Sequence, residues 1–83
     1  MRVRWESPNR YYGAVLQTDL LGDWVLSTTW GGLRNRLGAL KHTALPSREA
    51  GVKEIESLHK LRLRRGYRLV ARDEGARAAV LAT

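Results

Sequence analysis

Alternating apolar and polar side chains predict strands throughout the first half of the chain. Residues 2–6 (RVRWE) alternate basic with apolar side chains, and residues 10–18 (RYYGAVLQT) are rich in aromatic and branched ones. Both patterns are typical of half-buried strands, and Ser7-Pro8-Asn9 between them has the composition of a turn. Residues 24–30 and 37–45 predict two further strands.

The third of these strands carries an indole at each end of one face. Side chains alternate between the two faces of a strand, so Trp24, Leu26, Thr28 and Trp30 point the same way. Gly31-Gly32 follows Trp30 directly, and paired glycines are expected to end the strand there. Before the strand, residues 19–23 predict a hairpin loop in which Gly22 can adopt a positive φ.

The second half of the chain predicts one helix, residues 48–65. Pro46-Ser47 precedes it with Ser47 placed as the N-cap, and Gly66 is placed to end it. Residues 67–70 predict a short strand, and residues 72–83 show no pattern that assigns an element. The expected core face of the helix comprises Val52, Ile55, Leu58, His59 and Leu63. The predicted core consists of Leu16, Trp24, Leu26, Val52, Ile55 and Leu58.

Strands followed by a helix indicate an α+β fold, with an antiparallel sheet of four or more strands packed against one main helix. The 83 residues are expected to form one domain, because a chain of this length buries only roughly 60–65% of its unfolded surface. There is no cysteine for a disulfide or a thiolate metal site. The N-terminus lacks a signal-peptide pattern and no apolar run is long enough to span a membrane. We therefore expect a cytoplasmic protein without membrane contact.

The formal net charge of +7 makes an anionic partner the first expectation. Twelve of the fifteen basic residues are arginine, which suits bidentate phosphate contacts and stacking. Two basic runs stand out, residues 34–41 and 60–72, and the second has six basic residues and no acidic one. Nucleic acid is the partner that this balance suggests first, ahead of anionic membranes and acidic proteins.

Catalytic and metal chemistry find little support in the residues. His42 and His59 are the only histidines. Ser57 lies two residues before His59 on the predicted helix, where side chains do not face each other. Scattered carboxylates and the absence of cysteine make a poor metal site. We expect no catalytic residue, no metal ligand and no cofactor, with His59 at the edge of the core and His42 on the surface.

The run YYGAVLQTDLLGDWVLSTTWGGLRNRLG, followed by PSREA and KLRLRRGY, resembles the WGR domain. This module occurs in eukaryotic poly(ADP-ribose) polymerases and in many bacterial proteins, and the pattern here is closer to the bacterial members. The resemblance covers about residues 9–70, with residues 71–83 as an extension. Its markers keep their order and spacing: Tyr12, Asp19, Gly22, Trp24, Leu26, Trp30-Gly31, Gly38, Pro46-Ser47 and Gly66-Tyr67.

The resemblance implies an antiparallel sheet with one helix, and it implies nucleic-acid binding. In the polymerases the domain holds the 5′ side of a DNA break, with its tryptophan against the terminal sugar. The matching positions are Trp30 for stacking, Gly31 for close backbone approach, and Arg62 and Tyr67 at the helix end. One departure concerns the name-giving motif, because Gly32 stands where the family has arginine and Arg34 follows two positions later.

These observations predict a non-catalytic nucleic-acid-binding module, with DNA favoured over RNA. The candidate binding residues are Trp30, Gly31, Arg34, Arg36, Lys41, Arg62, Arg65 and Tyr67. The alternative is a module that docks on a partner protein through the same surface, since tryptophan, tyrosine and arginine also dominate protein interfaces. Trp30 itself has two interpretations, as a stacking residue for the ligand or as a half-buried core residue.

Overall fold

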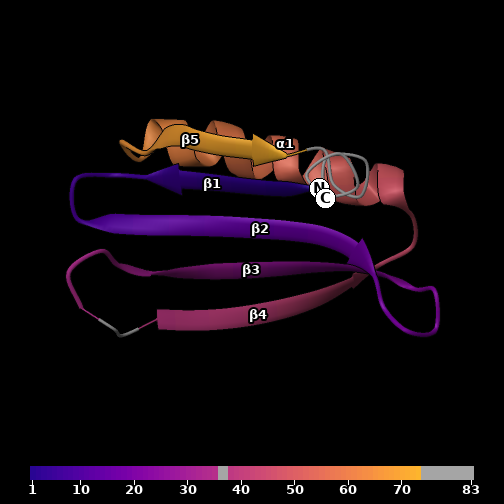
Figure 1. Ribbon diagram of the computed structural model, residues 1–83. Coiled ribbons are helices and arrows are strands. Elements are labelled where there is room, and N and C mark those ends of the chain that lie inside the picture. Colours follow the sequence, from indigo (N-terminus) through magenta and orange to yellow (C-terminus); the bar gives the residue numbers. More distant parts are fainter. Residues whose placement is uncertain (36–37, 74–83) are drawn as a thin grey trace.

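A five-stranded antiparallel sheet with one helix across one face forms the fold in the computed structural model, which describes residues 1–35 and 38–73 (Figure 1). The order across the sheet is β4-β3-β2-β1-β5. The elements are β1 (Arg2–Glu6), β2 (Arg10–Thr18), β3 (Trp24–Gly32), β4 (Gly38–Leu45), α1 (Arg48–Arg64) and β5 (Arg68–Asp73). This confirms the predicted α+β fold, with an antiparallel sheet and one main helix.

Two strands run further than the sequence predicted. The prediction that paired glycines end the third strand is wrong, because Gly31 and Gly32 stay in β3 and pair with Tyr11 and Arg10 of β2. The last strand extends to Asp73 because it pairs antiparallel along the whole of β1. The first strand thereby becomes an interior strand of the sheet. The remainder of the C-terminal extension, residues 74–83, lies outside the described residues.

The predicted turn and cap residues adopt the expected conformations. Gly22 and Gly66 both have a φ of 84°, a region that side chains disfavour. The Ser47 hydroxyl accepts a hydrogen bond from the Ala50 N–H at 3.1 Å, which caps the N-terminus of α1. At the other end, the Tyr67 N–H donates to the Arg62 carbonyl at 2.9 Å and the Gly66 N–H to that of Leu63 at 3.2 Å. This is the Schellman arrangement, which fixes how the chain leaves the helix.

The core lies between the sheet and α1 and is built from six buried apolar residues. Three of the six predicted core residues, Leu16, Leu26 and Ile55, are buried, whereas Trp24, Val52 and Leu58 are half-buried and pack against them. Sequence reasoning did not include Val3 and Trp5 of β1. The full core set is Val3, Trp5, Ala14, Leu16, Leu26 and Ile55. Trp5 has no exposed surface, because α1 covers this face of the sheet and β1 has a neighbouring strand on each side.

One side of α1 faces the sheet, and it comprises Gly51, Ile55 and, near the C-terminal end, Arg62. Gly51 lies so close to Leu16 of β2 that a Cβ would overlap the leucine methyl groups, so the glycine lets α1 approach the sheet. Ile55 lies on the same side of α1, and Arg62 falls within about 20° of Ile55 in projection. The prediction that Leu63 belongs to the core face is wrong: it is 49% exposed, because it is turned about 80° from Ile55.

The two histidines have the roles that the sequence predicted. His59 is half-buried on α1, and its Nδ1 accepts a hydrogen bond from the indole N–H of Trp5 at 2.9 Å. That bond satisfies the polar atom of the most buried side chain in the core. His42 is exposed on β4, where its Nδ1 lies 2.7 Å from the Ser27 hydroxyl.

Among the described residues there is no helix with the length and apolar character that crossing a membrane requires.

Replacing Ile55 with alanine should lower the free energy of unfolding by about 2–5 kcal/mol, because it removes buried methyl groups and leaves a cavity. Lys53→Ala, at an exposed position of the same helix, is the matched control and should change stability by less than about 0.5 kcal/mol. Chemical denaturation measures both. Equal effects of the two substitutions would contradict the placement of Ile55 in the core.

His59→Phe should destabilise the protein by about 1–3 kcal/mol, because the ring remains while the buried indole N–H of Trp5 loses its acceptor. His42→Phe provides the control at the other histidine, whose exposed bond to Ser27 can be replaced by water. Denaturant titrations of both variants test this. If the His42 variant loses as much stability as the His59 variant, the buried Trp5–His59 bond contributes no more to stability than the exposed Ser27–His42 contact.

Candidate nucleic-acid interface

Three connections meet at one end of the sheet and enclose a surface hollow. They are the turn between β1 and β2, the start of the connection that follows β3, and the turn between α1 and β5 (Figure 1). The Leu33 N–H donates to the Asn9 carbonyl at 2.9 Å and ties the first two together. The hollow has a volume of about 600 Å³. Its lining comprises Asn9, Arg10, Tyr12, Trp30, Gly31, Gly32, Asn35, Arg62 and Tyr67.

A row of aromatic rings connects the core with this hollow. Trp5, Tyr12 and Trp30 occupy directly opposed positions on β1, β2 and β3. The rings of Trp5 and Tyr12 are 6.1 Å apart and tilted by 58°, while those of Tyr12 and Trp30 are 5.9 Å apart and nearly parallel, at 14°. Exposure rises along the row from 0% at Trp5 to 36% at Trp30. Trp30 is therefore held by a packed neighbour and still presents ring surface to the hollow.

Arg62 lies between two tyrosine rings, near the C-terminal end of the sheet-facing side of α1. Its guanidinium carbon is 4.3 Å from the ring centre of Tyr12 and 5.2 Å from that of Tyr67. Such cation–π contacts hold a planar cation in place. The Nε atom is buried and has no hydrogen-bond partner. A guanidinium held in this way can receive a phosphate or carboxylate through two parallel hydrogen bonds.

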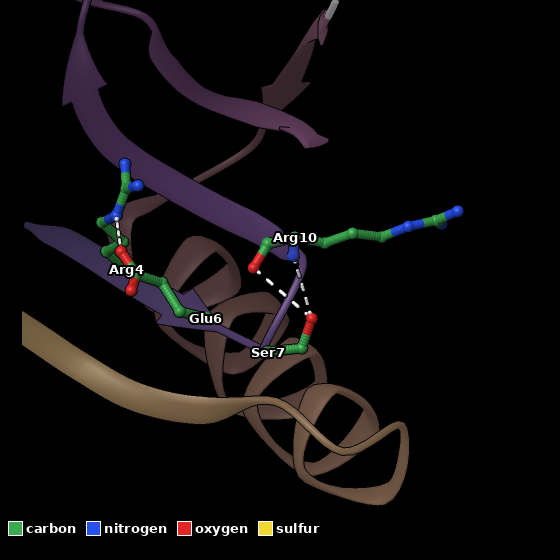
Figure 2. A network of polar contacts seen from close by, with 4 residues as sticks. All are labelled: Arg4, Glu6, Ser7 and Arg10. Atoms are coloured by element: carbon green, nitrogen blue, oxygen red, sulfur yellow. Dashed lines mark hydrogen bonds and ion pairs between the residues drawn. The ribbon is translucent and has the colours of Figure 1, made fainter. Parts of the chain in front are cut away.

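The wall of the hollow is electropositive. Among its described lining residues there are two arginines, Arg10 and Arg62, and no carboxylate. Glu6, the nearest acidic residue in the sequence, forms an ion pair with Arg4 at 2.9 Å (Figure 2). Both side chains belong to the face of β1 opposite Trp5, so this carboxylate does not neutralise the hollow.

The turn between β1 and β2 is closed by Ser7 (Figure 2). The Ser7 N–H donates to the Arg10 carbonyl at 2.9 Å, and the Ser7 hydroxyl accepts from the Arg10 N–H at 3.1 Å. The Arg10 side chain extends away from this turn into solvent (Figure 2). Its backbone is thus fixed while its charge stays accessible.

The side chain of Asn35 lies against Gly32 in the wall of the hollow. A Cβ on Gly32 would lie only 2.7 Å from Nδ2 of Asn35, so the amide side chain occupies the space where any side chain at position 32 would begin. An arginine at position 32 would displace Asn35. The Asn35 amide therefore fills the part of the wall that a side chain at position 32 would enter.

The structure brings together half of the predicted site residues. Trp30, Gly31, Arg62 and Tyr67 line the hollow. The other predicted residues that the structure describes, Arg34, Lys41 and Arg65, are exposed and do not belong to its lining, while Arg36 lies outside the described residues.

Five lining residues were not among the predicted site residues: Asn9, Arg10, Tyr12, Gly32 and Asn35. A signal for Tyr12 was present, because a hairpin loop at residues 19–23 pairs Thr18 with Trp24 and, six residues along each strand, Tyr12 with Trp30. The same ladder pairs Arg10 with Gly32. Asn9 and Asn35 follow only from the tertiary approach of the connections.

Comparison with known proteins identifies no similar protein, so a functional proposal has to rest on the geometry of the hollow and on the residues themselves. No protein-family model matches the chain, and neither a curated protein nor a solved structure matches it. Within residues 1–35 and 38–73, no three histidine or carboxylate side chains gather in a way that could hold a metal ion. The resemblance to the WGR domain stays a prediction that rests on the residues quoted for it.

Proposed function

We propose that the protein is a non-catalytic nucleic-acid-binding module that holds a nucleic-acid strand, with DNA as the expected ligand, at the hollow. The observation that carries the proposal is the guanidinium of Arg62, stacked between Tyr12 and Tyr67 beside the partly exposed indole of Trp30. Stacking surfaces combined with fixed cations are the means by which proteins bind single nucleic-acid strands. The resemblance to the WGR domain supports the same surface.

Arg62 is the residue that we assign to a phosphate. Its rotamer is fixed by the two tyrosine rings, so little side-chain entropy is lost when the ligand arrives. Fixed geometry also favours the bidentate contact that guanidinium makes with phosphate oxygens. Arg10, which is exposed, supplies a second cation in the lining.

The exposed basic residues outside the hollow act at longer range. Arg34, Lys41 and Arg65 have no share in the lining, yet they add to the net charge of +7. Exposed cations attract the phosphate chain and release its counterions without reading sequence. The expected binding is therefore strongly dependent on salt.

Docking on a partner protein is the alternative that the same surface leaves open, because Trp30 and Arg62 are the residue types that dominate protein interfaces. Salt separates the two, since an interface anchored on a buried aromatic residue loses little affinity when exposed charges are screened.

The logarithm of the association constant for duplex DNA should fall with the logarithm of salt concentration at a slope of roughly −3 to −4.5, as expected for about three to five neutralised phosphates. Arg62→Gln should make the slope less steep by about one. Arg48→Gln, at the opposite end of α1, is the matched control and should leave the slope unchanged. Fluorescence anisotropy at several salt concentrations measures all three. Affinity that ignores salt would favour the protein-partner alternative.

Trp30→Ala should weaken DNA binding by about 1–3 kcal/mol, the range for a stacking residue. Its effect on stability should stay below the ~3–5 kcal/mol of a fully buried aromatic residue, because more than a third of Trp30 is exposed. Trp24→Ala, at the other end of β3, is the control and should lower stability while the folded protein keeps its affinity. Thermal melts and DNA titrations of both variants decide. A folded Trp30 variant that binds DNA as before would assign Trp30 to the core.

A further inference from the structure

We propose that the hollow receives one unpaired nucleobase, so that the protein prefers strands with unpaired nucleotides over continuous duplex. This inference rests on the proposed nucleic-acid binding and goes beyond it, because phosphate contacts alone do not distinguish paired from unpaired strands. Single-stranded DNA and single-stranded RNA share the required chemistry, which is a free base with a phosphate attached.

The first argument is the accessible surface of Trp30. One side of the indole is occupied by the parallel ring of Tyr12, while the exposed part faces the hollow. Gly31 and Gly32 follow it in β3 and carry no side chain that could cover it. A flat partner can therefore lie against the ring. Bases inside a duplex already have neighbours on both faces, so only an unpaired or terminal base can stack on the indole.

The second argument is the volume and composition of the hollow. A volume of about 600 Å³ falls within the range of sites that enclose small ligands, whereas a contact with the phosphate chain needs only an open basic surface. Two amide side chains, Asn9 and Asn35, belong to the lining. An amide presents both a donor and an acceptor, which is the pattern found on the edges of bases.

The third argument is that a stacking surface and a cation lie next to the same ring. Tyr12 contacts both the indole of Trp30 and the guanidinium of Arg62, and all three residues line the hollow. A nucleotide carries a flat base and an anionic phosphate joined by a sugar. The hollow offers a partner for each, an aromatic surface for the base and a guanidinium for the phosphate.

Four labelled hairpins test the inference by fluorescence anisotropy. One ends in a blunt duplex, one carries a five-nucleotide thymine overhang, one carries the same overhang with abasic sites, and one carries a uracil RNA overhang. The thymine overhang should bind about 5- to 150-fold more tightly than the abasic one, which keeps the phosphates and lacks the bases. Comparison of the thymine and uracil overhangs shows whether the base site distinguishes DNA from RNA.

Variants of residues inside and outside the hollow test whether the preference for unpaired bases arises there. Trp30→Ala should abolish the difference between the thymine and abasic overhangs. Tyr11→Ala is the matched control, because Tyr11 precedes Tyr12 in β2 and therefore belongs to the opposite face of the sheet. It should leave the difference intact. Trp30→Tyr, which keeps a ring, replaces the alanine variant if that variant does not fold, and it should retain part of the preference.

Two results would overturn the inference, and they are distinguishable. Equal affinity for the thymine and abasic overhangs, with blunt duplex still bound, would refute the base site while the proposed nucleic-acid binding stands. Absence of binding to all four hairpins at low salt would overturn the proposed function itself. The first comparison uses the unaltered protein, so it does not depend on the folding of any variant.

Discussion

Complete burial of the Trp5 indole is the constraint on which the remaining structure depends. An indole in the core must satisfy its N–H, and His59 of α1 provides the acceptor. This bond joins α1 directly to β1. The buried ring also needs neighbours on both sides of its strand, which β2 and β5 supply. The Trp5 side chain therefore depends both on the position of the helix and on the order of the strands.

Two sets of contacts connect that core with the hollow, one along the sheet and one along the helix. Along the sheet, Tyr12 packs against Trp5 and Trp30 packs against Tyr12. Along the helix, Arg62 lies one turn beyond His59 and reaches Tyr12 from above the sheet. The Trp30 ring on β3 keeps part of its surface uncovered. A domain too small for a deep cleft therefore has its site at the end of the sheet, where the connections meet.

Local patterns located most elements correctly, because strands and helices differ in period and their ends carry recognisable caps. Ser47, Gly22 and Gly66 could be placed from the sequence since each acts on its immediate neighbours. Trp5 could not be recognised as the central core residue, because its burial depends on a partner strand more than sixty residues away. Arg62 was predicted as a site residue, but its orientation toward the sheet was not predicted. The sheet-facing side of the helix was identified from apolar residues alone, so an arginine on that side was not recognised.

The backbone bond between Tyr67 and Arg62 has a consequence for how the chain can change in length. It joins both residues to one rigid helix end, so an inserted residue between them would separate the cation from one of its rings. At the opposite end of the sheet, the hairpin loop between β2 and β3 carries Leu20 and Leu21 in full contact with solvent (Figure 1). Exposed loop tips of this kind accept added residues at small entropic cost. One end of the sheet is therefore closed to insertions, and the other offers the place at which a label or a second domain can be joined without disturbing the hollow.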